Sequence, residues 1–163
     1  MLYVTVRRGG DYVMSQALDA PYYQPLEPTQ AVNYKNWSVL RDQRRKTQVC
    51  KLTQSATVTE KAGGFDLRIQ ANGTAGVPLA VEISLREGGQ LSGCKPAPHV
   101  DGGWILDSAY ATYTVGGQSV RFGPGAAPHL LTQLRGADAK LPGVSVYLTG
   151  YTPFDRVVSI EFS

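Results

Sequence analysis

Residues 109–122 read AYATYTVGGQSVRF, and this stretch decides the fold. Two runs that contain Tyr, Thr, Val and Phe flank Gly116 and Gly117. A two-residue glycine connection suits a tight β-hairpin, because the favoured turns need positive φ at their central residues. The stretch therefore predicts two antiparallel strands, over residues 109–115 and 119–122.

The same pattern occurs at the start of the chain and again in its middle. Gly9 and Gly10 separate residues 2–7 from residues 12–17, and apolar and polar side chains alternate in the first run. Residues 65–71, with the sequence FDLRIQA, show the cleanest alternation of all. Strict alternation predicts a half-buried strand, because successive side chains point to opposite faces of a sheet.

Glycine and proline turns divide most of the remaining chain into further short extended segments. The other predicted strands are residues 49–60 (one strand or two), 78–86, 90–92, 104–106, 129–134, 144–151 and 157–162. We find no internal repeat of fixed period, which disfavours a propeller or a solenoid. Roughly eleven or twelve short strands with these turn signals predict an all-β chain, an antiparallel β-sandwich or a jelly-roll-like fold.

Two segments depart from this pattern. Residues 19–29 hold Pro21, Pro25 and Pro28, which should exclude a central strand and discourage a helix. Residues 30–47 are the one candidate helix, with apolar side chains at loosely helical spacing but weak caps. We expect an extended or looped segment in the first case and a short helix or an irregular loop in the second.

Composition and charge limit the class of protein. The 163 residues suit one domain, residues 1–163, with a core of its own. The 18 glycines and 10 prolines are normal for a turn-rich β-protein, and nine tyrosines exceed the four phenylalanines and two tryptophans. The net charge of +3 is too small to predict a nucleic acid partner. Residues 41–46 are a basic run interrupted by Asp42 and Gln43, which we interpret as a solvated face.

No stretch reaches membrane-spanning length, and residues 1–6 do not resemble a signal peptide. We therefore expect no membrane partner, and a cytoplasmic chain as written or a piece of a larger exported protein. The two cysteines, Cys50 and Cys94, do not form a C-x-x-C motif, so no zinc site is expected. They could pair in an oxidising compartment or stay as two thiols, and the sequence leaves both open.

The aromatic and arginine side chains indicate the first candidate chemistry, which is sugar binding. Sugars present apolar C–H faces beside hydroxyl groups, so a sugar site needs an aromatic platform with polar groups close by. Arginine could bind uronate carboxylates or sulfates, because the guanidinium fork matches oxyanions. The wider set of candidates is Tyr22, Tyr23, Trp37, Trp104, Tyr110, Tyr151, Arg41, Arg44, Arg45, Arg121, Arg135 and Arg156.

Each of these residues alone is better explained by core packing or by an ordinary surface position. Their joint excess nevertheless favours ligand binding. The predicted ligand-binding residues are Tyr22, Tyr23, Trp37, Trp104, Arg121 and Arg135.

Catalytic patterns are weaker. Polysaccharide β-elimination needs a neutralised uronate, a base and an acid, which Tyr113, His129, Arg121 and Arg135 could supply. His99 and Asp101 have the spacing of a strand-borne acid–base or metal pair, but nothing else completes a ligand set. No carboxylate pair stands out for hydrolysis, and no phosphate-binding loop or nucleophile elbow is present. The sequence therefore predicts no metal and no cofactor.

Four segments resemble a known family. They are GVPLAVEI (76–83), GGQLSG (88–93), RFGPG (121–125) and LTGYTPF (148–154), and they are similar to the C-terminal β-region of heparinase II/III-like polysaccharide-degrading proteins. These are turn and core segments. The family's catalytic tyrosine and histidine lie mostly in an α-toroid and a first sandwich, so no catalytic residue is carried over. The resemblance implies an accessory or terminal β-sandwich that contacts sugar.

The leading hypothesis is a non-catalytic carbohydrate-associated module, which binds acidic polysaccharide or forms the tail of a polysaccharide-degrading enzyme. One alternative is a small lyase or hydrolase of the same substrates. The other is a structural or assembly domain whose exposed sheet edge pairs with a partner, including a second copy of the chain.

Overall fold

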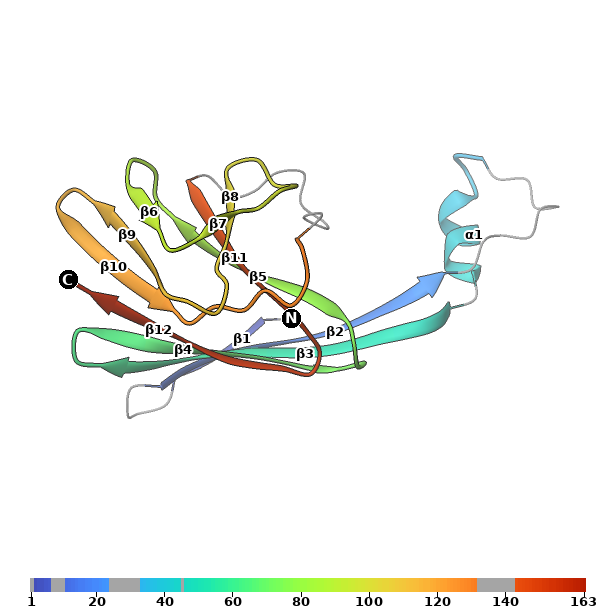
Figure 1. The fold of residues 1–163 in the computed structure, drawn as a ribbon. Helices are drawn as coiled ribbons and strands as arrows, with labels where there is room; N and C mark the ends of the chain where they lie inside the picture. Colours follow the sequence, from blue (N-terminus) through green and yellow to red (C-terminus); the bar gives the residue numbers. More distant parts are fainter. Residues whose placement is uncertain (1, 7–10, 24–32, 45, 132–142) are drawn as a thin grey trace.

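A computed structural model describes residues 2–6, 11–23, 33–44, 46–131 and 143–163. Their fold is two β-sheets and one short helix (Figure 1). The larger sheet has the order β1 (Leu2–Val6), β2 (Asp11–Tyr23), β3 (Lys46–Lys61), β4 (Gly64–Gly73), β12 (Phe154–Phe162), β10 (Gln118–Gly123), β9 (Ala111–Val115) and β6 (Gln90–Ser92). The smaller has the order β5 (Pro78–Leu85), β11 (Val144–Tyr151), β8 (Gly103–Ile105) and β7 (Lys95–Pro96). The predicted all-β sandwich is confirmed.

The pairing is antiparallel throughout the described sheets except between β8 and β11, which run parallel. The hairpin predicted over residues 109–122 is present. Val115 pairs with Gln118, and the intervening Gly116 and Gly117 have φ of 60° and 78°. Positive φ at both central residues is the type I′ geometry that matches strand twist, and glycine adopts it without a steric penalty.

The two sheets pack face to face over only part of the large sheet. The core between them is a cluster of seven buried side chains: Leu106, Ala111, Tyr113, Phe122, Val146, Leu148 and Val158. In the large sheet these come from β9, β10 and β12, and no described residue of β1–β4 belongs to the cluster or to the apolar side chains packed against it. We call the covered part the body, β1–β3 the arm, and the face of the large sheet that carries Val158 the inner face.

Figure 1 shows β2 and β3 extending well past the body toward α1 (Trp37–Gln43). The helix falls within the predicted 30–47 segment. The backbone N–H of Leu40 donates to the carbonyl oxygen of Asn36, and those of Asn36 and Trp37 donate to Asn33. No helix of the described chain is long and apolar enough to cross a bilayer.

Residues 19–29 were expected to be extended or looped and not a central strand, and residues 19–23 are extended as the last part of β2. Pro21 is tolerated there for two reasons. Pairing of β1 with β2 stops at Gln16, so among the described strands the later part of β2 pairs with β3 alone. The register of β2 against β3 also shifts between Ala20 and Tyr22, which places the proline at a bulge.

The prediction of a strand over residues 129–134 was wrong for residues 129–131, and the other residues of that segment lie outside the described part of the chain. Residues 126–131 instead form a loop that is tied to β11. The backbone N–H of Thr149 donates to the carbonyl of Ala126, and its hydroxyl donates to the carbonyl of His129. These bonds replace a strand ladder. Leu131 then packs in a second apolar cluster with Tyr147, on the other face of the small sheet.

The core can be tested with a pair of matched substitutions. Leu148→Ala should lower the free energy of unfolding by about 2–5 kcal/mol, because Leu148 is fully buried between the sheets. Leu130→Ala removes the same atoms from a side chain that is 67% exposed, so its effect should be below about 0.5 kcal/mol. Urea denaturation of both variants measures the difference, and equal effects would contradict this placement of the core.

Candidate binding surface

The six predicted ligand-binding residues lie in two separate regions. Tyr22 and Tyr23 are the last two residues of β2, and their backbones pair with Thr47 and Lys46. Trp37 begins α1, at the same end of the arm, and is half exposed. The side chains of Tyr22 and Tyr23 lie outside the described part of the structure. These three aromatic residues therefore share the tip of the arm and are distant in the fold from the body.

The other three do not form one site either. Trp104 lies in β8 of the small sheet and packs against the core cluster. Arg121 lies in β10 of the large sheet, and Arg135 lies outside the described residues. Trp104 also lines a hollow of about 480 Å³ in the 96–104 loop, together with His99 and Asp101. In the part of the chain that the structure describes, no group of three His, Cys, Asp or Glu side chains could hold a metal ion.

Arg121 is already occupied by neighbours. Its guanidinium carbon lies 3.7 Å from the centre of the Tyr110 ring, and its Nη1 donates to Glu161 Oε2 at 3.1 Å. The guanidinium thus covers the ring face that a sugar would need, while the carboxylate neutralises its charge. Arg121 and Tyr110 form a paired surface contact instead of a free platform.

The same holds across the outer face of the large sheet, opposite the inner face. Arg68 donates to both carboxylate oxygens of Asp155, at 2.9 and 2.6 Å, and Gln70 adds a third bond at 3.0 Å. The hydrogen bond from Arg68 holds the pKa of Asp155 below its usual value. Lys61 pairs with Asp66 at 2.9 Å on the same face. The outer face is therefore a surface of neutralised charges.

A different environment exists at the turn between β11 and β12. A hollow of about 280 Å³ is lined there by Tyr151, Pro153, Asp155 and Arg156 among others. Tyr151 is 45% exposed and Arg156 is exposed. Within the described residues, no carboxylate pairs with Arg156. A half-exposed tyrosine and an arginine with no carboxylate partner among the described residues thus line one hollow, which we call the turn hollow.

Local packing fixes the walls of the turn hollow. A Cβ on Gly150 would lie 2.3 Å from the Phe154 ring, so only glycine lets that ring sit against β11. Phe154 is buried as a result. His129 Nε2 lies 3.1 Å from the carbonyl of Leu79 and 3.0 Å from that of Gly150, which favours a proton on this nitrogen. The imidazole packs on Tyr151 with ring centres 4.8 Å apart and so positions its ring.

Tyr151 and Arg156 were in the wider set of sequence candidates but not among the six predicted. They lie on either side of the Thr152-Pro153 turn, five positions apart. The turn that leads from β11 in the small sheet to β12 in the large sheet brings them to one hollow, and attention to residues that flank a tight turn could have found them.

The residues proposed for β-elimination do not assemble. Tyr113 is 2% exposed, and its hydroxyl donates to the carbonyl of Arg86 and accepts from the N–H of Gly89. Arg121 lies on the outer face, next in sequence to the buried Phe122. His129 bonds to backbone carbonyls at the turn hollow. Arg135 lies outside the described residues.

One polar cluster was not expected from the sequence. Glu82 Oε1 accepts from the hydroxyl of Ser145 at 2.6 Å and from that of Tyr147 at 3.0 Å. Ser145 and Tyr147 are buried, and burial raises the pKa of Tyr147. Alternation in residues 144–149 places their hydroxyls on one face of the small sheet, so the signal was available. Both hydroxyls are satisfied, which makes the cluster a packing feature.

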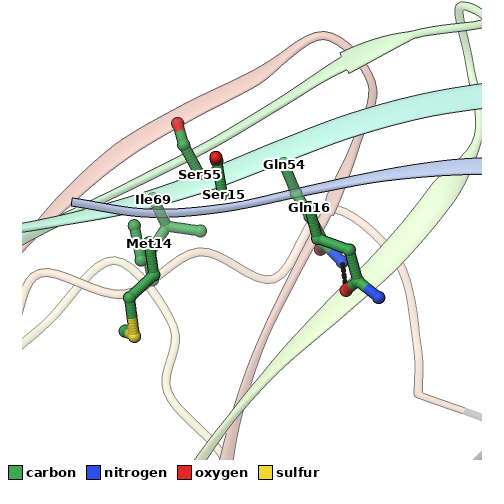
Figure 2. Close-up of a pocket in the computed structure, with 7 residues that line it drawn as sticks. Met14, Ser15, Gln16, Gln54, Ser55 and Ile69 are labelled. Carbon is green, nitrogen blue, oxygen red and sulfur yellow. Dashed lines mark hydrogen bonds between the residues drawn. The ribbon is translucent and has the colours of Figure 1, made fainter. Parts of the chain in front are cut away.

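A further hollow, of about 170 Å³, lies on the arm (Figure 2). Met14, Gln16 and Gln54 point to one side of the sheet in Figure 2, and Ser15 and Ser55 point to the other. Gln54 Nε2 donates to Gln16 Oε1 at 3.0 Å. Tyr12 pairs with Val58, Val58 with Leu67, and Leu67 with Val158, so Tyr12 lies on the inner face. Met14 is two residues further along β2 and therefore lies on the same face.

Comparisons of this chain with family models, with curated proteins and with solved structures find no match. The resemblance to heparinase II/III-like proteins therefore stays a prediction.

The two cysteines are free thiols. Burial raises the pKa of Cys94 from 9.0 to about 11. This shift should lower the thiolate fraction of Cys94 near pH 8 by about 100-fold. We expect its alkylation by iodoacetamide, followed by mass spectrometry, to be slower by at least that factor in the folded protein than in urea. Equal rates in the two states would contradict the burial of this thiol.

The Arg68–Asp155 pair predicts a titration shift. The pair stabilises the fold above the ordinary carboxyl pKa of 3.8, and this contribution is lost as the pH falls through the lower pKa of the folded state. Arg68→Gln should return the Asp155 pKa toward 3.8, as read from carboxyl carbon shifts by NMR. Lys95→Gln removes the partner of Asp107 instead and should leave Asp155 unchanged. An Asp155 pKa that is the same with and without Arg68 would rule out this cause.

Proposed function

We propose that this chain is a non-catalytic, carbohydrate-associated β-sandwich module that binds acidic polysaccharide at the turn hollow. The observation that supports the proposal is the joint presence there of a half-exposed tyrosine and an arginine that has no carboxylate partner within the described part of the chain. The other exposed arginines with described ion pairs, Arg68 and Arg121, are neutralised by Asp155 and Glu161.

The chemistry of the hollow suits a uronic acid or a sulfated sugar. A tyrosine face packs against the apolar C–H face of a pyranose, and its hydroxyl remains free to exchange hydrogen bonds with water or with sugar. The guanidinium of Arg156 can donate two parallel hydrogen bonds to a carboxylate or a sulfate. His129 packs against the tyrosine ring, which lowers the entropic cost of ordering the ring on binding.

A binding role is better supported than catalysis. The tyrosine available for elimination chemistry, Tyr113, is buried and has both hydrogen-bonding roles filled. The exposed Tyr151 has Arg156 beside it, but His129 next to it is bonded to backbone carbonyls. A site of this kind can hold an acidic sugar without moving a proton. The module could equally serve as the tail of a polysaccharide-degrading enzyme, as the family resemblance implies.

Titration calorimetry with acidic polysaccharides tests the proposal. We expect binding to polygalacturonate, alginate or heparin and none to a neutral glucan. Arg156→Gln should weaken binding by about tenfold or more, since it removes a charge-assisted hydrogen bond. Tyr151→Ala should weaken it to a similar degree, and added salt should weaken binding of the unsubstituted protein.

Arg121→Gln is the matched control, because it removes an arginine that is already paired with Glu161 on the outer face, and neither residue lines the turn hollow. Its affinity should stay near that of the unsubstituted protein. Absence of binding to every acidic glycan would remove the proposed function, and so would equal losses in the Arg121 and Arg156 variants.

A further inference from the structure

The ring of His129 faces hydrogen-bond acceptors at both of its nitrogens. Nε2 lies 3.1 Å from the carbonyl oxygen of Leu79 and 3.0 Å from that of Gly150, and Nδ1 lies 3.1 Å from that of Leu130. A carbonyl oxygen accepts hydrogen bonds and cannot donate them. Neutral imidazole has one N–H group, whereas the imidazolium ion has two. Only the charged ring therefore donates to all three oxygens.

The neutral ring fits these neighbours incompletely. With its proton on Nε2 it donates to Leu79 and Gly150, and the lone pair of Nδ1 then faces the carbonyl oxygen of Leu130. Protonation of Nδ1 replaces this contact between two acceptors with a hydrogen bond. Hydrogen bonds that involve an ionised group are the stronger ones. The ring can therefore gain a positive charge without leaving its place.

The backbone of His129 is fixed to the small sheet. The hydroxyl of Thr149 accepts from the backbone N–H of His129 at 3.4 Å and donates to its carbonyl oxygen at 2.8 Å. Thr149 belongs to β11 and is fully buried. The imidazole and the Tyr151 ring have their centres 4.8 Å apart. A charge that His129 gains therefore stays next to Tyr151.

This charge lies at the wall of the turn hollow. His129 does not line the hollow itself, but Gly150 and Tyr151, which its ring contacts, both do, and so does Arg156. A cation against a tyrosine ring is attracted by the π-electrons and holds the ring in place. The protonated imidazole thus orients Tyr151 and adds a second positive charge near an anion that Arg156 binds.

Histidine is the one titratable residue type around this ring whose ordinary change of charge falls between about pH 5 and 8. The other titratable side chains on the described elements around it are Glu82 on β5, Tyr147 and Tyr151 on β11, and Asp155 and Arg156 on β12. Both carboxylates have partners, since Glu82 accepts from the hydroxyl of Tyr147 and Asp155 pairs with Arg68. Arg156 is the like charge, and a bound anion screens the two cations from each other.

We infer that His129 makes the turn hollow sensitive to acid, because its imidazolium form raises the affinity of the hollow for an anionic sugar. The inference rests on the proposed function, since it assigns a role in binding the same class of ligand. Proton uptake at Nδ1 and anion binding strengthen each other by the same factor, because coupling between two binding events is reciprocal. A neutral sugar gains nothing from the added charge, so the proton also favours acidic over neutral glycans.

Titration calorimetry with heparin at about pH 5.5 and about pH 8 tests the inference, because histidine changes charge in this range and the acidic groups of heparin stay ionised. We expect binding to be about threefold to tenfold tighter at the lower pH, the effect of one added charge in a partly exposed site. His129→Gln should abolish the difference, since its amide donates to carbonyl oxygens but carries no charge. His99→Gln is the matched control, because it removes the other histidine of the chain, which lines the hollow of the 96–104 loop, and it should keep the difference. Circular dichroism checks that both variants are folded.

A measurement without ligand tests the geometry separately. In nitrogen-15 NMR spectra of the ring, Nε2 of His129 should carry a proton at both pH values and Nδ1 only at the lower one. A neutral ring with its proton on Nδ1 would overturn the inference. Heparin binding that does not change with pH, or that changes equally in His129→Gln, would overturn it and leave the proposed function in place. Absence of heparin binding at both pH values would overturn it too, and the wider panel of acidic glycans then decides the proposed function.

Discussion

The contact between the two sheets covers only part of the larger one, and the rest of the structure depends on where that cover ends. Val158 and Phe122 on one side and Val146 and Leu148 on the other are almost completely removed from water. Burial of apolar surface is the main favourable term in folding, so this contact is the main source of stability of the body. On β12 the inner face changes from buried Val158 to exposed Arg156 within two residues. Core and candidate site therefore meet on one strand.

Charge pairing selects among arginines that look equivalent in the sequence. Surface ion pairs such as Arg68–Asp155 contribute little to stability, but they neutralise the groups that an anionic ligand would otherwise use. Within the described residues Arg156 has no carboxylate partner, because its side chain is on the inner face while its neighbour Asp155 faces outward to Arg68. In the ladder Arg156 is opposite Ile69 of β4, the strand that pairs with β3 of the arm.

The fold class and the tight turns were available from the sequence, because they depend on local rules. Alternation in residues 65–71 and the pair Gly116-Gly117 act over a few residues, and the strands they predict are present. The sequence left residues 19–23 as extended or looped. That they complete β2 through Pro21 depends on where the pairing with β1 ends, which local rules do not give. A strand was predicted over residues 129–131 from their apolar side chains. Those side chains do not reveal that Thr149 of β11 hydrogen-bonds to the carbonyl groups of Ala126 and His129 in this loop.

The sequence by itself determined that this chain forms many short strands with one apolar flank, and that tyrosine and arginine would be the residues available for binding. It could not determine which of them are free. Trp104, Tyr113 and Arg121 are engaged by the core, by backbone groups or by a carboxylate, and these partners come from distant parts of the chain. Only the tertiary structure decided that Tyr151 and Arg156 line one hollow. The pairing of the strands decides which charged side chains lie close together, and the area of the large sheet that the small sheet covers decides which side chains stay exposed.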